Sequence, residues 1–376
     1  MQTITLSDAA APKPATPELG ATVSALADTE LAPLAVRIDR DGLYPEPFLR
    51  RLGAVGGFRP VAAADLSSQV DVIARVSEVC LSTGFLAWCQ SALIWYVRNS
   101  PNAAAREAWL EPAAAARLLG GTGLSNPMKA FFGIERLRLK ARRAGDGFIV
   151  DGTLPWVSNL GEGHVFGTIA ECVDDGSKVF FLAECGAPGV EIKRAGPFIA
   201  LEGTATYAVR FKEAPIPYRN VLADPIDGYL SRIRAGFVLL QSGMALGLIR
   251  DCIAIMREVE PALGHVNRFL EVQPDALEAE CAAFAREAQA LAEDPFDPSP
   301  GHWRRVIALR LAAGEATLKA AQAAMLHAGA RGYLASARPQ RRLREAQFVA
   351  IVTPATKQLR KMLHDLDDGP GVQRPQ

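Results

Sequence analysis

The sequence has 376 residues, of which 49% are hydrophobic, and its 41 lysines and arginines balance its 41 aspartates and glutamates. A chain of this length can bury a large core in two or three subdomains. The balanced charge argues against nucleic acid or an anionic membrane surface as a partner. Six scattered cysteines without a C-x-x-C pair give no sign of a metal site or a disulfide framework. With no uninterrupted apolar run of about 18 residues and no signal-peptide pattern, we expect a cytoplasmic protein without a membrane span.

The first third of the chain is predicted to be helical after a loose tail at residues 1–16, where proline and small residues lack periodicity. Apolar residues at helical spacing predict helices near 17–39, 47–55, 62–82 and 103–119. The stretch from Thr83 to Val97 is apolar nearly all round, which indicates a buried helix or one that lines an apolar pocket. Trp88 and Trp95 lie on one face of that helix and are predicted to be core residues.

The remaining two thirds divide into a β-rich part and a helical part. Residues 121–224 are rich in β-branched and aromatic residues with frequent turns, which predicts a β-domain. Four long helices are predicted near 229–260, 275–292, 301–328 and 340–365, and a bundle is their economical packing. The predicted fold class is α+β, with a helical domain at 17–120, a β-domain at 121–224 and a four-helix domain at 225–376.

One stretch, GDGFIVDGTLPWVSNLG from Gly145 to Gly161, combines β-propensity with turn chemistry. Asp151-Gly152 is a strong two-residue turn signal, which predicts a hairpin with a return strand that begins at Trp156. Trp156 and Ser158 would share one side of that strand because successive side chains alternate. An indole face and a hydroxyl placed this way can cover and hydrogen-bond a flat heterocycle.

Three motifs in this order resemble those of the acyl-CoA dehydrogenase superfamily of flavoproteins. GDGFIVDGTLPWVSN is similar to the family's G-D-x-Y-x-I-N-G-x-K-x-W-I-T-N, and FKEAPIPYRNVL to its F-x-x-V-x-V-P-x-x-N-V-L. HAGARGY, from His327 to Tyr333, is similar to F-G-G-x-G-Y. The resemblance extends from about residue 20 to residue 365 and implies that family's helical, β and four-helix domains.

The resemblance implies a bound flavin, FAD or FMN. Trp156 would lie against the isoalloxazine ring and Ser158 would hydrogen-bond near its N5 atom. The other implied cofactor contacts are Leu124, Ser125, Val157, Gly329 and Gly332. The family's G-A-G-S-D segment is replaced by the bulkier Met128 to Phe132, and its Arg-x-x-Phe-Gly motif is absent, so weak flavin binding is expected.

The family's catalytic glutamate is missing at both of its known locations. Dehydrogenation beside a thioester needs a base for the α-proton, and Thr353 and Phe237 stand at the two corresponding positions. A threonine hydroxyl is too weak a base for this step, which leaves the catalytic residue unknown. Glu202 and Glu345 are the nearest displaced candidates, although a solvated or ion-paired role is the more common one for such residues.

The resemblance therefore implies a flavin-dependent oxidoreductase, most simply an acyl-CoA dehydrogenase-like one that acts on an acyl thioester or a related small molecule, with an electron-transfer flavoprotein as its partner. One alternative is a flavin-dependent monooxygenase of the same fold that uses oxygen and reduced flavin from a partner reductase, since an apolar cavity shields such chemistry from water. The other alternative is a non-catalytic binding or scaffold protein.

The predicted helix at 301–328 also bears on assembly. It carries Ile307, Leu311 and Leu318 on one side and alanines on another. Two apolar faces predict two neighbours, so we expect a homodimer or a homotetramer.

Overall fold

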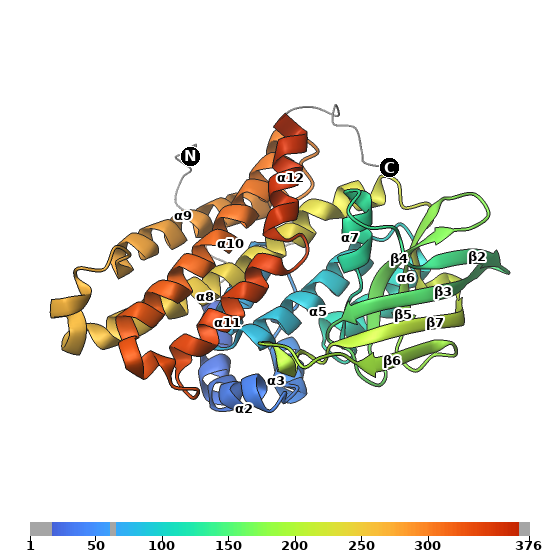
Figure 1. Cartoon of the computed structure of the whole chain (residues 1–376). Helices are drawn as coiled ribbons and strands as arrows, with labels where there is room; N and C mark the ends of the chain where they lie inside the picture. The colour runs from blue at the N-terminus through green and yellow to red at the C-terminus, as the bar shows by residue number, and fades with distance from the viewer. Residues whose placement is uncertain (1–16, 61–64, 368–376) are drawn as a thin grey trace.

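The structure, a computed structural model, describes residues 17–60 and 65–367, and it has N-terminal helices, a central sheet and C-terminal helices (Figure 1). This arrangement confirms the predicted fold class. The predicted tail at 1–16 and the predicted start of a helix at Ala62 lie outside the described residues.

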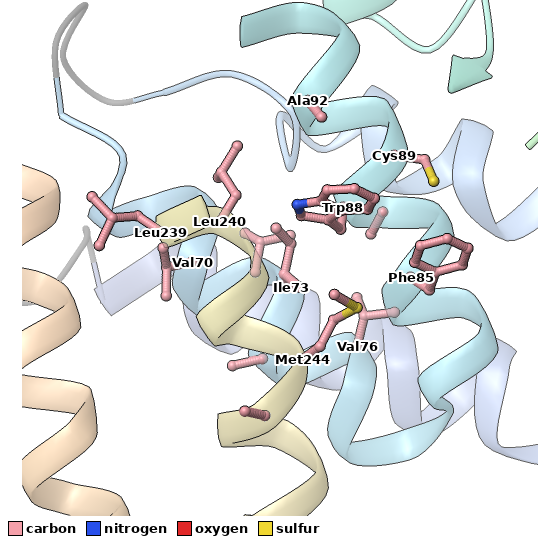
Figure 2. Close-up of a cluster of buried hydrophobic side chains, with 14 of the residues drawn as sticks. Val70, Ile73, Val76, Phe85, Trp88, Cys89, Ala92, Leu239, Leu240 and Met244 are labelled. Atoms are coloured by element: carbon pink, nitrogen blue, oxygen red, sulfur yellow. The ribbon is translucent and has the colours of Figure 1, made fainter. Parts of the chain in front are cut away.

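The N-terminal helices are α1 (Pro17–Leu26), α2 (Ala35–Arg40), α3 (Glu46–Ala54), α4 (Ser67–Val79), α5 (Leu81–Asn99) and α6 (Ala103–Ala114). Between α1 and α2 the chain widens into a π turn, Ala27–Leu31, and then tightens into a 3-10 turn, Ala32–Leu34, so the single helix predicted over 17–39 is interrupted. Helix α5 is buried without a break from Leu81 to Val97, which confirms the prediction of a buried helix. Figure 2 shows Phe85 and Trp88 of α5 among buried side chains of α4 and α8.

The central sheet contains β1 (Gly120–Thr122), β2 (Lys140–Ala144), β3 (Gly147–Val157), β4 (Val165–Cys172), β5 (Lys178–Glu184), β6 (Val190–Arg194), β7 (Tyr207–Ile216) and β8 (Val221–Ala223). Its strand order is β6-β7-β3-β2-β4-β5-β8, and β1 pairs in parallel with β4. The short helix α7 (Ser125–Phe131) follows β1 directly. In Figure 1 the sheet lies at one side of the molecule, and α5 and α7 stand between it and the long helices.

The predicted hairpin turn at Asp151-Gly152 is wrong. The turn lies at Gly145 and Asp146, between β2 and β3, and β3 runs on through residues 151 and 152 with a shift of register against β7. Gly152 takes φ +131 there, and a Cβ at that position would lie 2.3 Å from the carbonyl oxygen of Arg138. Glycine is thus needed for a β-bulge, and the same residue pair that signals a turn instead re-aims the end of a long strand.

The C-terminal helices are α8 (Tyr229–Asn267), α9 (Pro274–Glu293), α10 (Pro300–Ala328), α11 (Arg338–Ile351) and α12 (Thr356–Asp367), with a 3-10 turn, η5 (Gly329–Tyr333), after α10. The single helix predicted over 340–365 is therefore wrong. Pro354 lacks an amide hydrogen and keeps Thr353 out of the helical region, so the chain breaks between α11 and α12. That break places Thr353 in a turn.

Helices α8 and α10 have apolar surfaces whose hydrophobicity alone would suggest a membrane span or a subunit interface. Helix α8 is long and apolar enough to cross a bilayer, but 89% of its most apolar window is buried inside the protein, as in the core helix of a soluble protein. On α10, both Ile307 and the alanines at 313, 320 and 324 are buried within the same chain. The two apolar faces of α10 therefore have intramolecular neighbours, and the homo-oligomer stays a prediction without support from this pattern.

Candidate functional site

A cavity of about 350 Å³ lies where all three parts of the fold meet. Its walls come from α5, β1 and α7 with the connection between them, the end of β3, the β6–β7 loop, the start of α8, and α11 with the turn that follows it. The lining residues are Phe85, Trp88, Thr122, Leu124, Ser125, Lys129, Trp156, Ser158, Phe198, Ile199, Ala200, Leu201, Thr204, Thr206, Phe237, Arg344, Gln347, Phe348, Ile351, Val352 and Thr353. Sites at the junction of subdomains are common for small ligands, and this volume is at the lower end of the usual range of about 300 to 1,000 Å³.

The end of β3 places Trp156 and Ser158 in this cavity together. Trp156 is 54% exposed, whereas Val157 between them is 1% exposed and packs in the core of the sheet. The alternation of a strand therefore acts as predicted for the first two residues. The Val157 side chain points to the opposite face, so a flavin contact from that residue would involve only its backbone.

Ser158 begins a row of hydroxyl groups along one wall. Its Oγ lies 2.7 Å from Oγ1 of Thr206, which in turn lies 2.9 Å from Oγ1 of Thr204. Thr204 donates to the carbonyl oxygen of Leu201 at 2.6 Å. Leu201 and Ala205 take left-handed backbone angles, with φ of 64 and 45. Such strain in non-glycine residues is often found at binding sites, where the surrounding structure holds it in place.

Ser125 and Thr353, both predicted site residues, meet on another wall, where their hydroxyl oxygens are 3.1 Å apart. The turn that carries Thr353 is held from behind by α8 and α10. Gln241 donates from Nε2 to the carbonyl oxygen of Thr353 at 2.9 Å, and Arg310 donates from Nε to Oε1 of Gln241 at 2.8 Å. Arg310 also donates to the carbonyl oxygen of Val349 at 2.5 Å. Burial lowers the pKa of Arg310 to about 10.

Four aromatic rings form the inner end of the cavity. Phe85 stacks on Trp88 with ring centroids 5.5 Å apart and meets Phe348 edge-on at 4.6 Å. Phe237 stands at one of the two positions where the family has its catalytic glutamate. Its ring centroid lies 5.2 Å from that of Trp88. Trp88 is thus both a core residue, as predicted, and part of the cavity wall. The predicted contact Leu124 lies in the same wall.

The charged groups of the cavity wall are already neutralised. Lys129 pairs with Glu135 at 3.0 Å, and Arg344 makes a two-pronged pair with Asp39 at 2.6 and 2.9 Å. Arg344 also donates to the carbonyl oxygen of Ile199 at 2.8 Å. Asp39 lines a second cavity of about 470 Å³, so this ion pair stands between the two cavities.

Neither candidate for a displaced base faces the cavity. Glu345 is fully buried and pairs with Arg342 at 2.8 Å. Glu202 accepts a hydrogen bond from the backbone amide of Phe198, and its side chain is not among the lining groups. Within residues 17–60 and 65–367, the cavity wall contains no aspartate, glutamate or histidine.

Gly329 and Gly332, the remaining predicted cofactor contacts, do not join this cavity. They lie in η5 and line a separate groove with residues of α8, including Glu258 and Val259. Met128, in the segment that replaces the family's G-A-G-S-D, is buried in helix α7. That segment is therefore a packed helix rather than an open loop.

Sequence reasoning missed several wall residues. The i, i+2 spacing of Thr204 and Thr206 would place both hydroxyls on one side of an extended strand, but Thr204 lies in a 3-10 turn and Ala205 is left-handed, so their contact depends on the turn. Arg344, Phe348 and Ile351 share a helical face at spacings of four and three, but nothing local identifies which face meets the cavity. Their site role depends on contacts far apart in the chain.

Comparisons with known proteins agree with this architecture. Residues 14–117 match the family model for the N-terminal domain of acyl-CoA dehydrogenase. The human mitochondrial short-chain specific acyl-CoA dehydrogenase is 23% identical over 347 residues, which cover 86% of this chain and 83% of that protein. Butyryl-CoA dehydrogenase from Megasphaera elsdenii has a TM-score of 0.81 at 15% identity, over 95% of this chain and 100% of that one. KijD3, solved in complex with FMN, has a TM-score of 0.78 at 17% identity over 96% of each chain. The N-terminal part of this chain thus matches the acyl-CoA dehydrogenase family, and the chain as a whole has the acyl-CoA dehydrogenase fold, as the resemblance of its motifs predicts.

Proposed function

We propose that this protein is a flavin-dependent monooxygenase built on the acyl-CoA dehydrogenase fold. The observation that carries the proposal is the chemistry of the cavity wall, which among the described residues contains hydroxyls, aromatic rings and compensated cations but no carboxylate or imidazole. Removal of an α-proton from a thioester requires such a base. Oxygen insertion from reduced flavin does not require one from the protein.

The residues at the end of β3 fit a flavin ring. Trp156 presents an indole that is 54% exposed at the cavity, and large exposed aromatic faces are typical of ligand contacts. The hydroxyls of Ser158 and Ser125 supply directional hydrogen bonds without charge, as a neutral heterocycle requires. FMN in the neighbouring KijD3 complex and FAD in the wider family are both compatible with this wall, and we infer weak, exchangeable binding.

Bound reduced flavin would supply two electrons, while oxygen supplies one atom to the substrate and leaves the other as water. The protein's part is to exclude bulk water and to hold the substrate beside the ring. Phe85, Phe237 and Phe348 give the substrate an apolar surface at the inner end of the cavity. Thr353 and Ser125 offer one hydrogen-bonding point beside it.

This reaction requires a source of reduced flavin, and we infer a partner flavin reductase in preference to an electron-transfer flavoprotein. Contacts from Gly329 and Gly332 to a flavin would have to come from a second copy of the chain, because η5 lies in a different groove from the cavity. A homodimer or homotetramer would satisfy that requirement. The second candidate function is dehydrogenation of an acyl thioester with a base supplied from outside the described wall.

The test supplies the purified protein with FMN or FAD, NADH, a flavin reductase and oxygen-18 gas, together with a panel of ring-bearing and acyl substrates. We expect a product that is heavier by one oxygen-18 atom and whose formation depends on this protein. Reductase alone is the control for uncoupled oxidation. A double bond introduced into an acyl-CoA without oxygen insertion would support the dehydrogenase, and failure to bind either flavin would support the scaffold protein.

A further inference from the structure

The second cavity, of about 470 Å³, lies at the start of α11 and is separated from the first by the ion pair between Arg344 and Asp39. Residues of α1, α2, α4 and α8 line it, together with the first residues of α11 and the segment 335–337 before that helix. Its volume is typical of sites for small molecules. The proposed flavin chemistry does not use this cavity, so its lining needs a separate explanation.

Helix α11, which is 14 residues long, begins at this cavity without a capping side chain. Its N-cap residue is Ala337, which lines the cavity, and no side chain of the described residues bonds the first amides of the helix. Because Pro339 has no N–H, the first amides that α11 offers are those of Arg338 and Gln340. The first turn of a helix has amides without intrahelical partners, and the helix dipole adds a partial positive charge there. Such an end favours a phosphate or a carboxylate.

A buried arginine with an unused donor stands beside this helix end. Arg341 lines the cavity, yet its side chain is only 8% exposed. Its Nη2 donates to the carbonyl oxygen of Val79 at 3.2 Å, whereas its Nε has no hydrogen-bond acceptor among the described residues. Oε1 of Glu345 lies 3.9 Å from Nε, which is too long for a hydrogen bond. Buried donors are nearly always paired, so this arginine indicates an acceptor that the chain itself does not supply.

The other charges around the cavity limit what that acceptor can be. Arg40 of α2 adds an exposed cation to the lining. Two carboxylates of the lining, Asp39 and Asp251, are each paired with an arginine of α11 at 2.6 Å. Two more, Asp28 and Glu78, also line the cavity and would repel a ligand with several negative charges. The lining therefore suits one oxyanion and disfavours a polyanion.

We propose that the second cavity is a binding site for a small molecule with a single oxyanionic group, a phosphate or a carboxylate, held by the first turn of α11 and by the Arg341 guanidinium. A guanidinium and helix amides together give charge-assisted hydrogen bonds to such a group. The cavity is much larger than the oxyanion alone, so the remainder of the ligand would be a neutral or cationic body beside Asp28 and Glu78. This site is separate from the first cavity, so the inference does not depend on the proposed function.

The test titrates the full chain with inorganic phosphate, with acetate and with inorganic pyrophosphate by calorimetry. We expect phosphate or acetate to bind and pyrophosphate to bind more weakly than phosphate. Ala337→Asp should weaken binding of the oxyanion by about tenfold or more, because the new carboxylate would cap the free amides and repel the ligand. Aspartate is a better N-cap than alanine, so this variant should unfold at an equal or higher urea concentration than the parent protein.

Two further variants locate the effect. Ala276→Asp adds the same charge at an exposed position in the first turn of α9, outside the cavity lining, and should keep the parental affinity. Arg341→Gln removes the buried cation and should also weaken binding by about tenfold or more, with folding checked by circular dichroism. Tighter binding of phosphate than of acetate would indicate a phosphorylated ligand, and the reverse order would indicate a carboxylic acid.

The inference would be overturned if neither phosphate nor acetate binds, or if Ala337→Asp binds them as tightly as the parent protein does. An equal loss of affinity in Ala276→Asp would also overturn it, because the effect would then be one of net charge. Pyrophosphate that binds more tightly than phosphate, with binding lost in Ala337→Asp, would reject a ligand with a single oxyanion.

Discussion

The guanidinium of Arg310, in α10, donates a hydrogen bond from Nε to the side-chain amide oxygen Oε1 of Gln241 at 2.8 Å. Arg310 is 1% exposed, and its hydrogen-bond acceptors among the described residues are an amide oxygen and a backbone carbonyl rather than a carboxylate. The amide of Gln241 is turned by this contact so that its nitrogen donates to the carbonyl oxygen of Thr353. A buried cation thus supports the turn that forms one wall of the cavity.

Replacing Arg310 with methionine should disturb both stability and the cavity. The change leaves Oε1 of Gln241 and the carbonyl oxygen of Val349 without donors, at a cost of about 1 to 3 kcal/mol in the free energy of unfolding. Flavin affinity should fall as well, because the Thr353 turn loses its support. Arg310→Lys should recover only part of both effects, since an ammonium lacks the planar fork of arginine. Urea denaturation and flavin titration measure the two effects.

Arg304→Met is the matched control for that experiment. Like Arg310, Arg304 makes two hydrogen bonds, but both are to Asp367, and the side chains of Arg304 and Asp367 are half exposed. Its loss should cost no more than about 1 kcal/mol. Parental stability and parental flavin affinity in Arg310→Met would contradict the proposed support of the Thr353 turn.

Removal of Trp156 or Ser158 should weaken flavin binding, since both line the cavity on one side of β3. We expect Trp156→Ala to reduce flavin affinity by about tenfold or more, which corresponds to about 1.4 kcal/mol for a lost aromatic face. Trp156→Phe should retain most of the affinity. Absorbance spectra and titration with FAD and FMN measure the effect. Unchanged spectra and affinity in both alanine variants would show that the flavin does not contact Trp156 and Ser158.

The ion pair between Arg344 and Asp39 should exclude anionic ligands from the cavity, because the carboxylate neutralises a guanidinium in the wall. Asp39→Asn would leave Arg344 uncompensated and should improve binding of 2-naphthoate relative to uncharged 2-naphthol by about tenfold. Calorimetric titration of both compounds gives the ratio. Asp224→Asn, which breaks a similar pair with Arg143 outside the cavity wall, should leave the ratio unchanged. An equal change in both variants would show that the effect is not local.

Features that depend on neighbouring residues in the chain were predicted correctly from the sequence, whereas features that depend on contacts between distant segments were not. Alternation along β3 depends on neighbouring residues alone, and it correctly places Trp156 and Ser158 together. The bulge at Gly152 depends on the carbonyl of Arg138 and on pairing with β7, so a local turn signal at Asp151-Gly152 is misleading there. Thr353 was located by resemblance, but its surroundings require contacts from α7, α8 and α10 that no local pattern contains.

Asn159, the last residue of the W-V-S-N motif, also has a role that depends on contacts with distant segments of the chain. It is fully buried in a left-handed conformation, accepts a hydrogen bond from Tyr44 at 2.7 Å and donates to the carbonyl oxygen of Gly120 at 2.6 Å. Its role is to tie β3 to β1 and to the N-terminal helices. A motif that looks functional along its whole length thus divides into two cavity residues, Trp156 and Ser158, and two structural residues, Val157 and Asn159.

Stability should decline as pH falls below about 6.5 because of His164. Burial lowers the pKa of His164, whose Nδ1 donates to the carbonyl oxygen of Asn159 at 3.0 Å. Between that lowered pKa and the ordinary value of 6.5, the unfolded chain binds a proton that the folded chain does not. The loss of stability therefore begins near the ordinary value and ends at the folded one, with a slope of at most about 1.4 kcal/mol per pH unit.

Urea denaturation between pH 5 and 8 measures this slope, and His302, whose pKa is also lowered by burial, adds to it in the same direction. His164→Asn should have a smaller slope than the parent protein over the same range. Stability that is flat or that rises on acidification, or an equal slope in the variant, would contradict a neutral buried His164.

Thr353→Glu should introduce the base that the cavity wall lacks. A carboxylate there would lie among apolar groups, and desolvation would raise its pKa towards the range useful for proton abstraction. Burial of an imperfectly bonded carboxyl should cost about 1 to 3 kcal/mol of stability, so folding is checked first by circular dichroism and urea denaturation. Thr353→Gln, which has nearly the same shape without the ability to act as a base, is the matched control. A gain of acyl-CoA oxidation in the glutamine variant would contradict the proton-transfer role.

The most direct measurement is anaerobic mixing of the flavin-loaded parent protein with a panel of saturated acyl-CoA thioesters in a stopped-flow spectrophotometer. The absence of a carboxylate or imidazole from the described cavity wall predicts that flavin absorbance in the blue persists with every thioester, while Thr353→Glu bleaches with at least one of them. Rapid bleaching of the parent protein would show that a base reaches the substrate from elsewhere, and it would identify the protein as a dehydrogenase in place of a monooxygenase.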